Sequence, residues 1–295
     1  MPAPESQPQP VFAVVGPGAV GGLLAALLRR AGADVVVVAR EASARRIAER
    51  GLTITSGRYG EWISDVPAVT EVPAGAHVIL AVKAYALGEV IPQLAAAHPA
   101  EVLTLLNGVD HLPALAGALP GTDVIGAAIT IEAARTEPTV LEHRSSFARV
   151  TVPERAAGSP IATALADAGV AVTAAGTDAE VLWTKLRFLA TFALLTSRTE
   201  TGIGEALAAD PGLADALIEE IAAVASAEGV PTDAGELRAS VHGMPAGMRS
   251  SLQHDFAAGG PTELDAIGGA VARAARAHGI RTPALDATLA ELAAR

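Results

Sequence analysis

The stretch Val11–Gly21, VFAVVGPGAVG, decides the fold of this chain. An apolar run ends in the pattern G-x-G-x-x-G, and a helical pattern follows it. In a strand–turn–helix unit, the first glycine permits the tight turn, the second lets the backbone approach a pyrophosphate, and the third lets the helix lie close to the sheet. The amides that open such a helix face the phosphates, where the helix dipole favours negative charge. We therefore predict a dinucleotide-binding loop formed by Gly16, Gly18, Ala19, Val20 and Gly21.

The end of the second apolar run, Val35–Arg40 (VVVVAR), indicates which dinucleotide binds. An acid at this position hydrogen-bonds the ribose 2′-hydroxyl of NAD, whereas an arginine accommodates the 2′-phosphate of NADP. Arg40 has the planar fork of donors that suits phosphate. Glu41 could instead hydrogen-bond the ribose of NAD, unless it is the first residue of the next helix. Arg45 and Arg46 could equally lie on the solvated face of that helix. The sequence therefore predicts NADP(H) as the cofactor.

Composition narrows the class of protein. The chain has 295 residues, enough for two domains, and alanine supplies much of its 51% hydrophobic share. No stretch approaches the ~20 unbroken apolar residues of a membrane span, and residues 1–10 resemble a disordered tail rather than a signal peptide. The absence of cysteine excludes disulfides and thiolate catalysis, so we expect a cytoplasmic protein. A net charge of −11 argues against a nucleic-acid partner.

The chain is organised in two parts. Alternating patterns predict strands at 11–16, 34–39, 52–56, 77–82 and 101–106 and helices at 19–31, 41–50, 84–97 and 110–118, which is typical of a parallel sheet. Strand-like runs at 124–131, 140–143 and 147–152 are expected to extend that sheet, partly antiparallel, before a helix at 160–168 and a strand at 170–174. Helical patterns then cover 178–196, 202–208, 213–228, 233–240, 246–257, 262–277 and 283–293. We predict an α/β Rossmann-type domain over 1–176, followed by an all-α domain over 177–295.

Two polar residues follow predicted strands of the first domain. Lys83 ends the run ILAVK, and Asn107 ends the run LTLLN. Ligands of open α/β sheets bind outside the carboxyl ends of the strands, so both are candidates for contact with the cofactor and the substrate. The alternatives are a solvated loop lysine and an ordinary Asn-Gly turn.

The helical part supplies further candidates. Lys185 lies in an almost wholly apolar helix, where burial lowers a lysine pKa and favours proton donation, unless it is a surface lysine at the helix rim. No carboxylate stands three or four residues downstream, so Glu263 is a candidate partner from elsewhere, although Thr262–Asp265 also has capping-box spacing. Ser251 either binds a carboxylate or faces solvent. The histidines show no metal-ligand spacing, so no metal site is expected.

Together these residues resemble the ketopantoate reductase family (2-dehydropantoate 2-reductases), over nearly the whole chain. The glycine loop and Arg40 resemble its cofactor loop and NADP-selecting arginine. The segments AVKA, NGV and LWTKL resemble those of its active-site lysine, asparagine and catalytic lysine. SSLQHD and TELD resemble its substrate-binding serine and catalytic glutamate region, and AHGIRTP resembles its closing helix connection.

The resemblance implies a reductase that transfers a hydride from NADPH to a small 2-keto acid. Lys185 would act as general acid, Glu263 would orient Lys185 or the substrate, Ser251 would bind the substrate, and Lys83 and Asn107 would position its carbonyl. Leu189 and Ala193, however, replace asparagines usual in ketopantoate enzymes, so the substrate is left open. The alternatives are a same-fold reductase of another carbonyl or an imine in a specialised biosynthetic pathway, and a non-catalytic NADP-binding sensor or partner protein. The oligomeric state is also open, with a homodimer as the candidate assembly.

Overall fold

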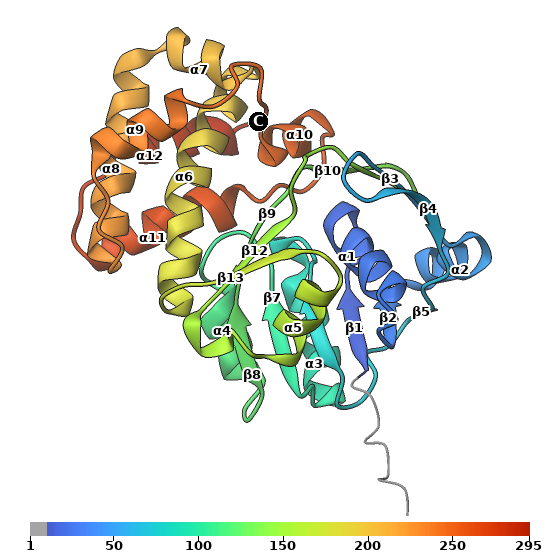
Figure 1. Cartoon of the computed structure of the whole chain (residues 1–295). Helices are drawn as coiled ribbons and strands as arrows, with labels where there is room; N and C mark the ends of the chain where they lie inside the picture. The colour runs from blue at the N-terminus through green and yellow to red at the C-terminus, as the bar shows by residue number, and fades with distance from the viewer. Residues whose placement is uncertain (1–10) are drawn as a thin grey trace, which may run out of the picture. The chain divides into compact units, whose positions relative to one another are not determined.

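The computed structural model describes residues 11–295, so the tail expected at 1–10 lies outside the described part of the chain. Two compact units make up the structure, and Figure 1 shows the elements of each. The α/β unit comprises the chain up to Val82, Ala86–Leu106 and Leu112–Gly176. The helical unit comprises Thr177–Arg295 and two short segments, Lys83–Tyr85 and Asn107–His111. Each of these short segments follows a strand of the α/β unit in the sequence, but it belongs to the helical unit.

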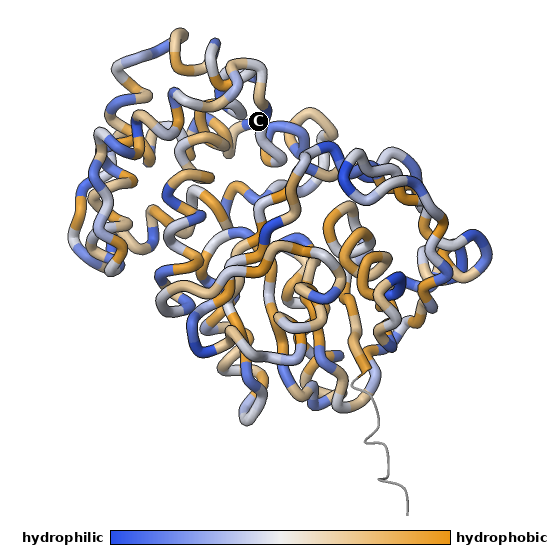
Figure 2. The backbone as a smooth tube through the Cα atoms, in the orientation of Figure 1, coloured by the Kyte–Doolittle hydropathy of each residue, from blue (hydrophilic) through white to orange (hydrophobic). Residues whose placement is uncertain are grey.

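The α/β unit is built on a six-stranded sheet of order β5-β2-β1-β6-β7-β8, in which every neighbouring pair is parallel. Its central strands are mostly apolar and almost wholly buried, as parallel strands covered on both faces should be, and Figure 2 shows the apolar course of β1 and α1. The strands are β1 (Phe12–Val15), β2 (Val35–Val38), β5 (Ala68–Val69), β6 (His77–Leu80), β7 (Glu101–Thr104) and β8 (Asp123–Gly126). The helices are α1 (Ala19–Arg30), α2 (Glu41–Arg50), α3 (Leu87–Ala97), α4 (His111–Ala118) and α5 (Pro160–Asp167).

Two further sheets correct the sequence prediction. The strand predicted at 52–56, β3 (Leu52–Ser56), does not join the main sheet but forms a second sheet of order β10-β11-β3-β4. That sheet also contains β4 (Gly60–Ser64), β10 (Ala133–Glu137) and β11 (Val140–His143), of which β4 and β10 were not predicted. A third sheet of order β13-β12-β9 contains β9 (Ala128–Thr130), β12 (Arg149–Val152) and β13 (Ala171–Ala174).

The runs at 124–152 therefore extend the main sheet only through β8, and the prediction that they all do so was wrong. The physical reason is long-range pairing: β11 pairs in parallel with β3, from Val140 beside Thr53 to His143 beside Ser56. Leu52 and Leu141 from these strands lie against Gly22 of α1, which has no side chain to hold them off. Local periodicity predicts a strand but not its partner.

The helical unit is arranged around one long helix, α6 (Asp178–Thr199). Thr177 and Glu180 cap its start with a reciprocal capping box. The other helices are α7 (Ile203–Ala209), α8 (Pro211–Ala227), α9 (Ala234–His242), α10 (Ser251–Ala257), α11 (Ala270–Ala277) and α12 (Pro283–Ala293). Their buried aliphatic side chains form one core with α6. The fold class predicted from the sequence, a Rossmann-type α/β part followed by a helical part, is confirmed.

Two of the predicted helices differ from the observed ones. The helix predicted at 246–257 begins only at Ser251, because the Ser250 hydroxyl caps it by accepting from the Gln253 amide at 3.1 Å. The helix predicted at 262–277 is a π-helical turn, Asp265–Gly269, that leads into α11. Within residues 11–295, no helix is long and apolar enough to cross a membrane.

Candidate functional site

The glycine loop of the α/β unit has the backbone of an anion site. Gly16 has φ of +91°, and a Cβ there would lie 2.7 Å from Val82 Cγ1. A Cβ on Gly21 would overlap the Gly16 carbonyl oxygen, so these two positions require glycine. By contrast, no atom lies within 4 Å of a Cβ on Gly18, and no side chain caps the start of α1. An open backbone at an uncapped helix start fits an anionic group such as a pyrophosphate.

Arg40 stands directly before α2, and Glu41 is the first residue of that helix. The Arg40 guanidinium pairs with Glu89 at 2.9 Å, but the two side chains are 83% and 69% exposed. Exposed pairs contribute little stability, so this contact leaves Arg40 free to bind another anion. Arg46 lines a surface pocket of about 320 Å³ with Ser43 and Arg135.

The helical unit gathers five polar side chains into what we call the polar cluster: Lys83, Asn107, Lys185, Asp255 and Glu263. Lys83 Nζ donates to Asp255 at 2.8 Å and to Glu263 at 3.0 Å. Asn107 Nδ2 donates to Glu263 at 3.1 Å, and Asn107 Oδ1 accepts from Lys185 Nζ at 2.9 Å. Glu263 also accepts from the Ala84 amide at 3.1 Å. A continuous chain of hydrogen bonds thus runs from Asp255 to Lys185.

Five separate parts of the chain build this cluster. Lys83 and Asn107 each stand three residues after a strand ends, Lys185 is on α6, and Asp255 is on α10. Glu263 is only 4% exposed and precedes the π-helical turn. Its buried carboxylate is matched by three donors, which is the condition for burying a charge without a large penalty. The cluster is therefore a fixed arrangement rather than a loose surface network.

Lys83 and Lys185 are the only two lysines in the sequence. Burial acts to lower the pKa of Lys83, but the charges and hydrogen bonds of Glu263 and Asp255 outweigh it and raise that pKa above its usual 10.5. Lys185 instead hydrogen-bonds a neutral amide. Burial lowers the pKa of Lys185 to about 8, and the charge of Glu263 offsets only part of that effect. One lysine is thus held charged, while the other can release its proton near neutral pH.

His111 is a buried neighbour of the cluster, 4% exposed, at the first position of α4. Burial lowers the pKa of His111 to about 4, and the positive charge of Lys185 adds to this effect. Neither ring nitrogen has a hydrogen-bond partner in the described structure. His111 is therefore neutral at physiological pH and adds no charge beside Lys185.

The structure revises several details of the predicted site. Glu263 was expected to pair with Lys185, but its direct partners are Lys83 and Asn107, and it reaches Lys185 only through Asn107. The capping-box reading of Thr262–Asp265 was wrong, because Glu263 turns its carboxylate into the cluster and the Thr262 hydroxyl accepts only from Leu264, at 3.4 Å.

The two serines before α10 differ in exposure. Ser250 is buried, caps α10 and accepts from Thr196 at 2.8 Å, whereas Ser251 is exposed and touches none of the other predicted residues through a recorded hydrogen bond. Asp255 was missed by the sequence reasoning, although it stands four residues after Ser251 and so shares its helix face. A signal in the sequence that could have indicated the cluster is that its two lysines, Lys83 and Lys185, are the only lysines of the chain.

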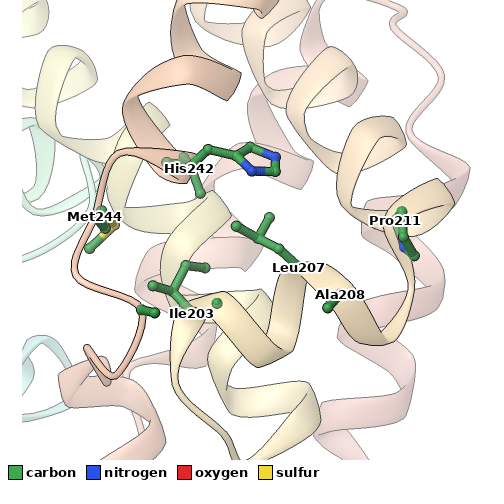
Figure 3. A pocket seen from close by; sticks show the side chains of 9 residues that line it. Ile203, Leu207, Ala208, Pro211, His242 and Met244 are labelled. Atoms are coloured by element: carbon green, nitrogen blue, oxygen red, sulfur yellow. The ribbon is translucent and has the colours of Figure 1, made fainter.

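A separate surface pocket of about 370 Å³ lies between α7 and the end of α9. Figure 3 shows Ile203 and Leu207 on one side of it, with His242 and Met244 across from them. Its lining is mostly apolar and includes no residue of the polar cluster. We therefore place the candidate chemistry at the cluster and not in this pocket.

A parallel sheet whose first strand leads through a G-x-G-x-x-G loop into a helix, followed in the chain by a helical unit, is typical of NAD(P)-dependent oxidoreductases. Residues 12–157 match the family described as "Ketopantoate reductase PanE/ApbA", and residues 179–295 match its C-terminal domain. The chain belongs to the ketopantoate reductase family and is an oxidoreductase, as the sequence resemblance predicted. Members of this family use NAD(P)H.

Individual relatives match nearly the whole chain. The 2-dehydropantoate 2-reductase of Mycobacterium tuberculosis is 31% identical over 299 residues, covering 96% of this chain and 97% of the relative. The uncharacterized oxidoreductase YkpB of Bacillus subtilis is 30% identical over 294 residues, covering 95% and 97%. Among solved structures, 2-dehydropantoate 2-reductase from Methylococcus capsulatus superimposes with a TM-score of 0.85 at 27% identity, over 96% of both chains.

Proposed function

We propose that this protein is an NADPH-dependent reductase of a small 2-keto acid, with Lys185 as the general acid. The observation that carries the proposal is the contrast between the two lysines of the polar cluster. Lys83 is held by two carboxylates, whereas Lys185 donates to the neutral Asn107 and has a pKa lowered by burial to about 8. A general acid works best when its pKa lies near the working pH.

The residues that would hold the cofactor's pyrophosphate are Gly16, Gly18, Ala19, Val20 and Gly21, because the backbone is open at Gly18 and no side chain caps the start of α1. Arg40 would bind the 2′-phosphate of NADPH, since its exposed pair with Glu89 is weak. When bound, the cofactor supplies the hydride for carbonyl reduction. The predicted contacts of Lys83 and Asn107 with the cofactor stay predictions.

The protein's own side chains divide the remaining work. Lys185 Nζ donates its proton to the substrate's carbonyl oxygen as that oxygen gains negative charge. Asn107 Oδ1 holds Lys185 Nζ in one direction at 2.9 Å. Lys83 stays cationic and attracts the substrate's negative oxygen atoms, while Glu263 fixes both Lys83 and Asn107. Ser251, on the same face of α10 as Asp255, is proposed to bind the substrate carboxylate.

The substrate is proposed to be less polar than ketopantoate. Leu189 and Ala193 lie one and two turns after Lys185 on α6, and Ala193 is fully buried. A substrate hydroxyl left without a partner in a buried site costs roughly 1–3 kcal/mol. A branched apolar 2-keto acid would avoid that loss, and another carbonyl or an imine is the alternative. We expect the protein to act in the cytoplasm, with a homodimer as the candidate assembly.

The test is a side-by-side measurement of kcat/KM with NADPH for ketopantoate and for branched apolar 2-keto acids. The proposal predicts that an apolar acid is favoured by about ten-fold to a hundred-fold, which is the loss above expressed as a ratio. Exclusive and efficient reduction of ketopantoate would refute the substrate class. Tight NADPH binding without turnover of any carbonyl or imine would instead indicate a non-catalytic sensor.

A further inference from the structure

Arg273 on α11 joins two segments that carry the polar cluster. Its Nε and Nη2 donate to Asp110 Oδ2 at 3.1 and 2.6 Å. Its Nη1 donates to Asp265 Oδ1 at 2.6 Å, and its Nη2 also donates to the Asp265 carbonyl oxygen at 3.0 Å. The guanidinium therefore bridges one carboxylate on each segment, a geometry that its planar fork suits and a lysine could not reproduce.

Both bridged residues stand close in sequence to members of the cluster. Asp110 is three residues after Asn107, and Asp265 is two residues after Glu263. Asn107 and Glu263 are themselves joined by the 3.1 Å hydrogen bond within the cluster. Arg273 thus connects, from outside the cluster, the same two segments that this hydrogen bond connects from within.

The backbone between these points is built for close approach. Gly108 has φ of +86°, and a Cβ there would overlap the Ala266 carbonyl oxygen of the π-helical turn. A Cβ on Gly269 would lie 2.5 Å from Asp265 Oδ1 and 3.1 Å from Arg273 Nη1, so glycine leaves room for the bridge. Asp265 is the first residue of the π-helical turn, Asp265–Gly269. Such turns often occur at functional sites.

We propose that Arg273 is a positioning residue that fixes Asn107 and Glu263, and through Asn107 the direction of Lys185. It touches neither lysine, and its side chain is 41% exposed, so the fold does not depend on burying it. This inference rests on the proposed function for its kinetic readout but not for its spectroscopic one. A small misplacement of a catalytic group can cost up to about a hundred-fold in rate.

The test compares Arg273→Gln with Arg276→Gln, which removes an exposed arginine from the same helix. We expect Arg273→Gln to lower kcat about ten-fold with little change in the KM for NADPH, and Arg273→Lys to recover only part of the loss. Arg276→Gln should remain within about two-fold of wild type. Equal kcat in the two glutamine variants, or a loss explained by a lower unfolding temperature alone, would overturn the proposal.

A second readout does not depend on turnover. With only two lysines, NMR of lysine-labelled protein follows both Nζ groups through a pH titration. Loosening Asn107 and Glu263 weakens the hydrogen bond that Lys185 donates to Asn107 and the attraction of the Glu263 charge, both of which favour charged Lys185, so Arg273→Gln should lower the pKa of Lys185. An unchanged titration would contradict the positioning role. If wild type reduces no carbonyl but this shift appears, the proposed function fails and the positioning role stands.

Discussion

The glycine loop and the polar cluster are built by opposite means. The loop is one contiguous stretch, and its chemistry comes from backbone: a glycine with φ of +91° at Gly16 and an open approach at Gly18. The cluster draws its side chains from five separate parts of the chain, and its chemistry comes from how they are paired. A backbone site tolerates change in most neighbouring side chains, whereas a site of paired charges depends on each member.

The largest effect should follow from removing the proposed acid of the cluster. Lys185→Ala should lower kcat by ~10²–10⁴-fold, the usual contribution of general acid catalysis. NADPH affinity should be preserved, because the proposed cofactor loop is built from other residues. Stopped-flow turnover and a fluorescence binding titration measure the two quantities. Turnover close to wild type would remove Lys185 from the mechanism and leave the cluster structural.

The α/β unit should respond differently, through cofactor choice. Arg40→Ala should raise the KM for NADPH by about ten-fold to a hundred-fold, since a charged hydrogen bond contributes roughly 1.5–3 kcal/mol. The KM for NADH should hardly change, because NADH has no 2′-phosphate. Arg45→Ala, one turn further along α2, is the matched control. Equal use of both cofactors by wild type would show that Arg40 does not select NADP.

A smaller effect should appear in the pH dependence of stability. The pKa of His111 is about 4 in the fold and near 6.5 when unfolded, so the neutral form is favoured by folding. The contribution of neutral His111 to the free energy of unfolding is present above pH 6.5 and is lost as the pH falls toward 4. The loss reaches about 2 kcal/mol by pH 5, at about 1.4 kcal/mol for each pH unit.

Denaturant unfolding of wild type and His111→Leu, at pH 7.5 and pH 5, measures this contribution. On going from pH 7.5 to pH 5, the free energy of unfolding of wild type should fall further than that of His111→Leu, because only wild type has His111 to protonate. Parallel losses in both proteins would mean that His111 is protonated without penalty, and therefore less buried than the structure has it.

The two regions also differ in how far sequence reasoning reached. Local sequence patterns predicted the glycine loop, Arg40 and the order of an α/β part and a helical part. Each glycine of the motif acts on the turn in which it stands, and each hydrophobic period describes one helix or strand. The pairing of β3 with β11, almost ninety positions away, was not predicted, since no local signal specifies a distant strand. Lys83, Asn107, Lys185 and Glu263 were named individually, but the one pairing expected among them, Glu263 with Lys185, is not direct.

Asp255 shows why the pairing was missed. Nothing in the sequence near Asp255 or Glu263 indicates that both acids bind Lys83, because only the fold brings the three residues together. The consequence is large, because the two acids raise the pKa of Lys83, whereas burial lowers the pKa of Lys185 and Glu263 offsets only part of that effect. Chemistry that depends on such a difference is a property of the assembled cluster and not of any motif.

The most direct measurement is therefore an NMR pH titration of lysine-labelled protein, in which two lysines give two Nζ curves. Lys185→Arg assigns the signals by removing one of them. We predict one midpoint at about 8 for Lys185 and one above 10.5 for Lys83, with kcat declining as the pH rises past the lower midpoint. Two midpoints above 10, or the lower midpoint on Lys83, would contradict the assignment of Lys185 as the proton donor.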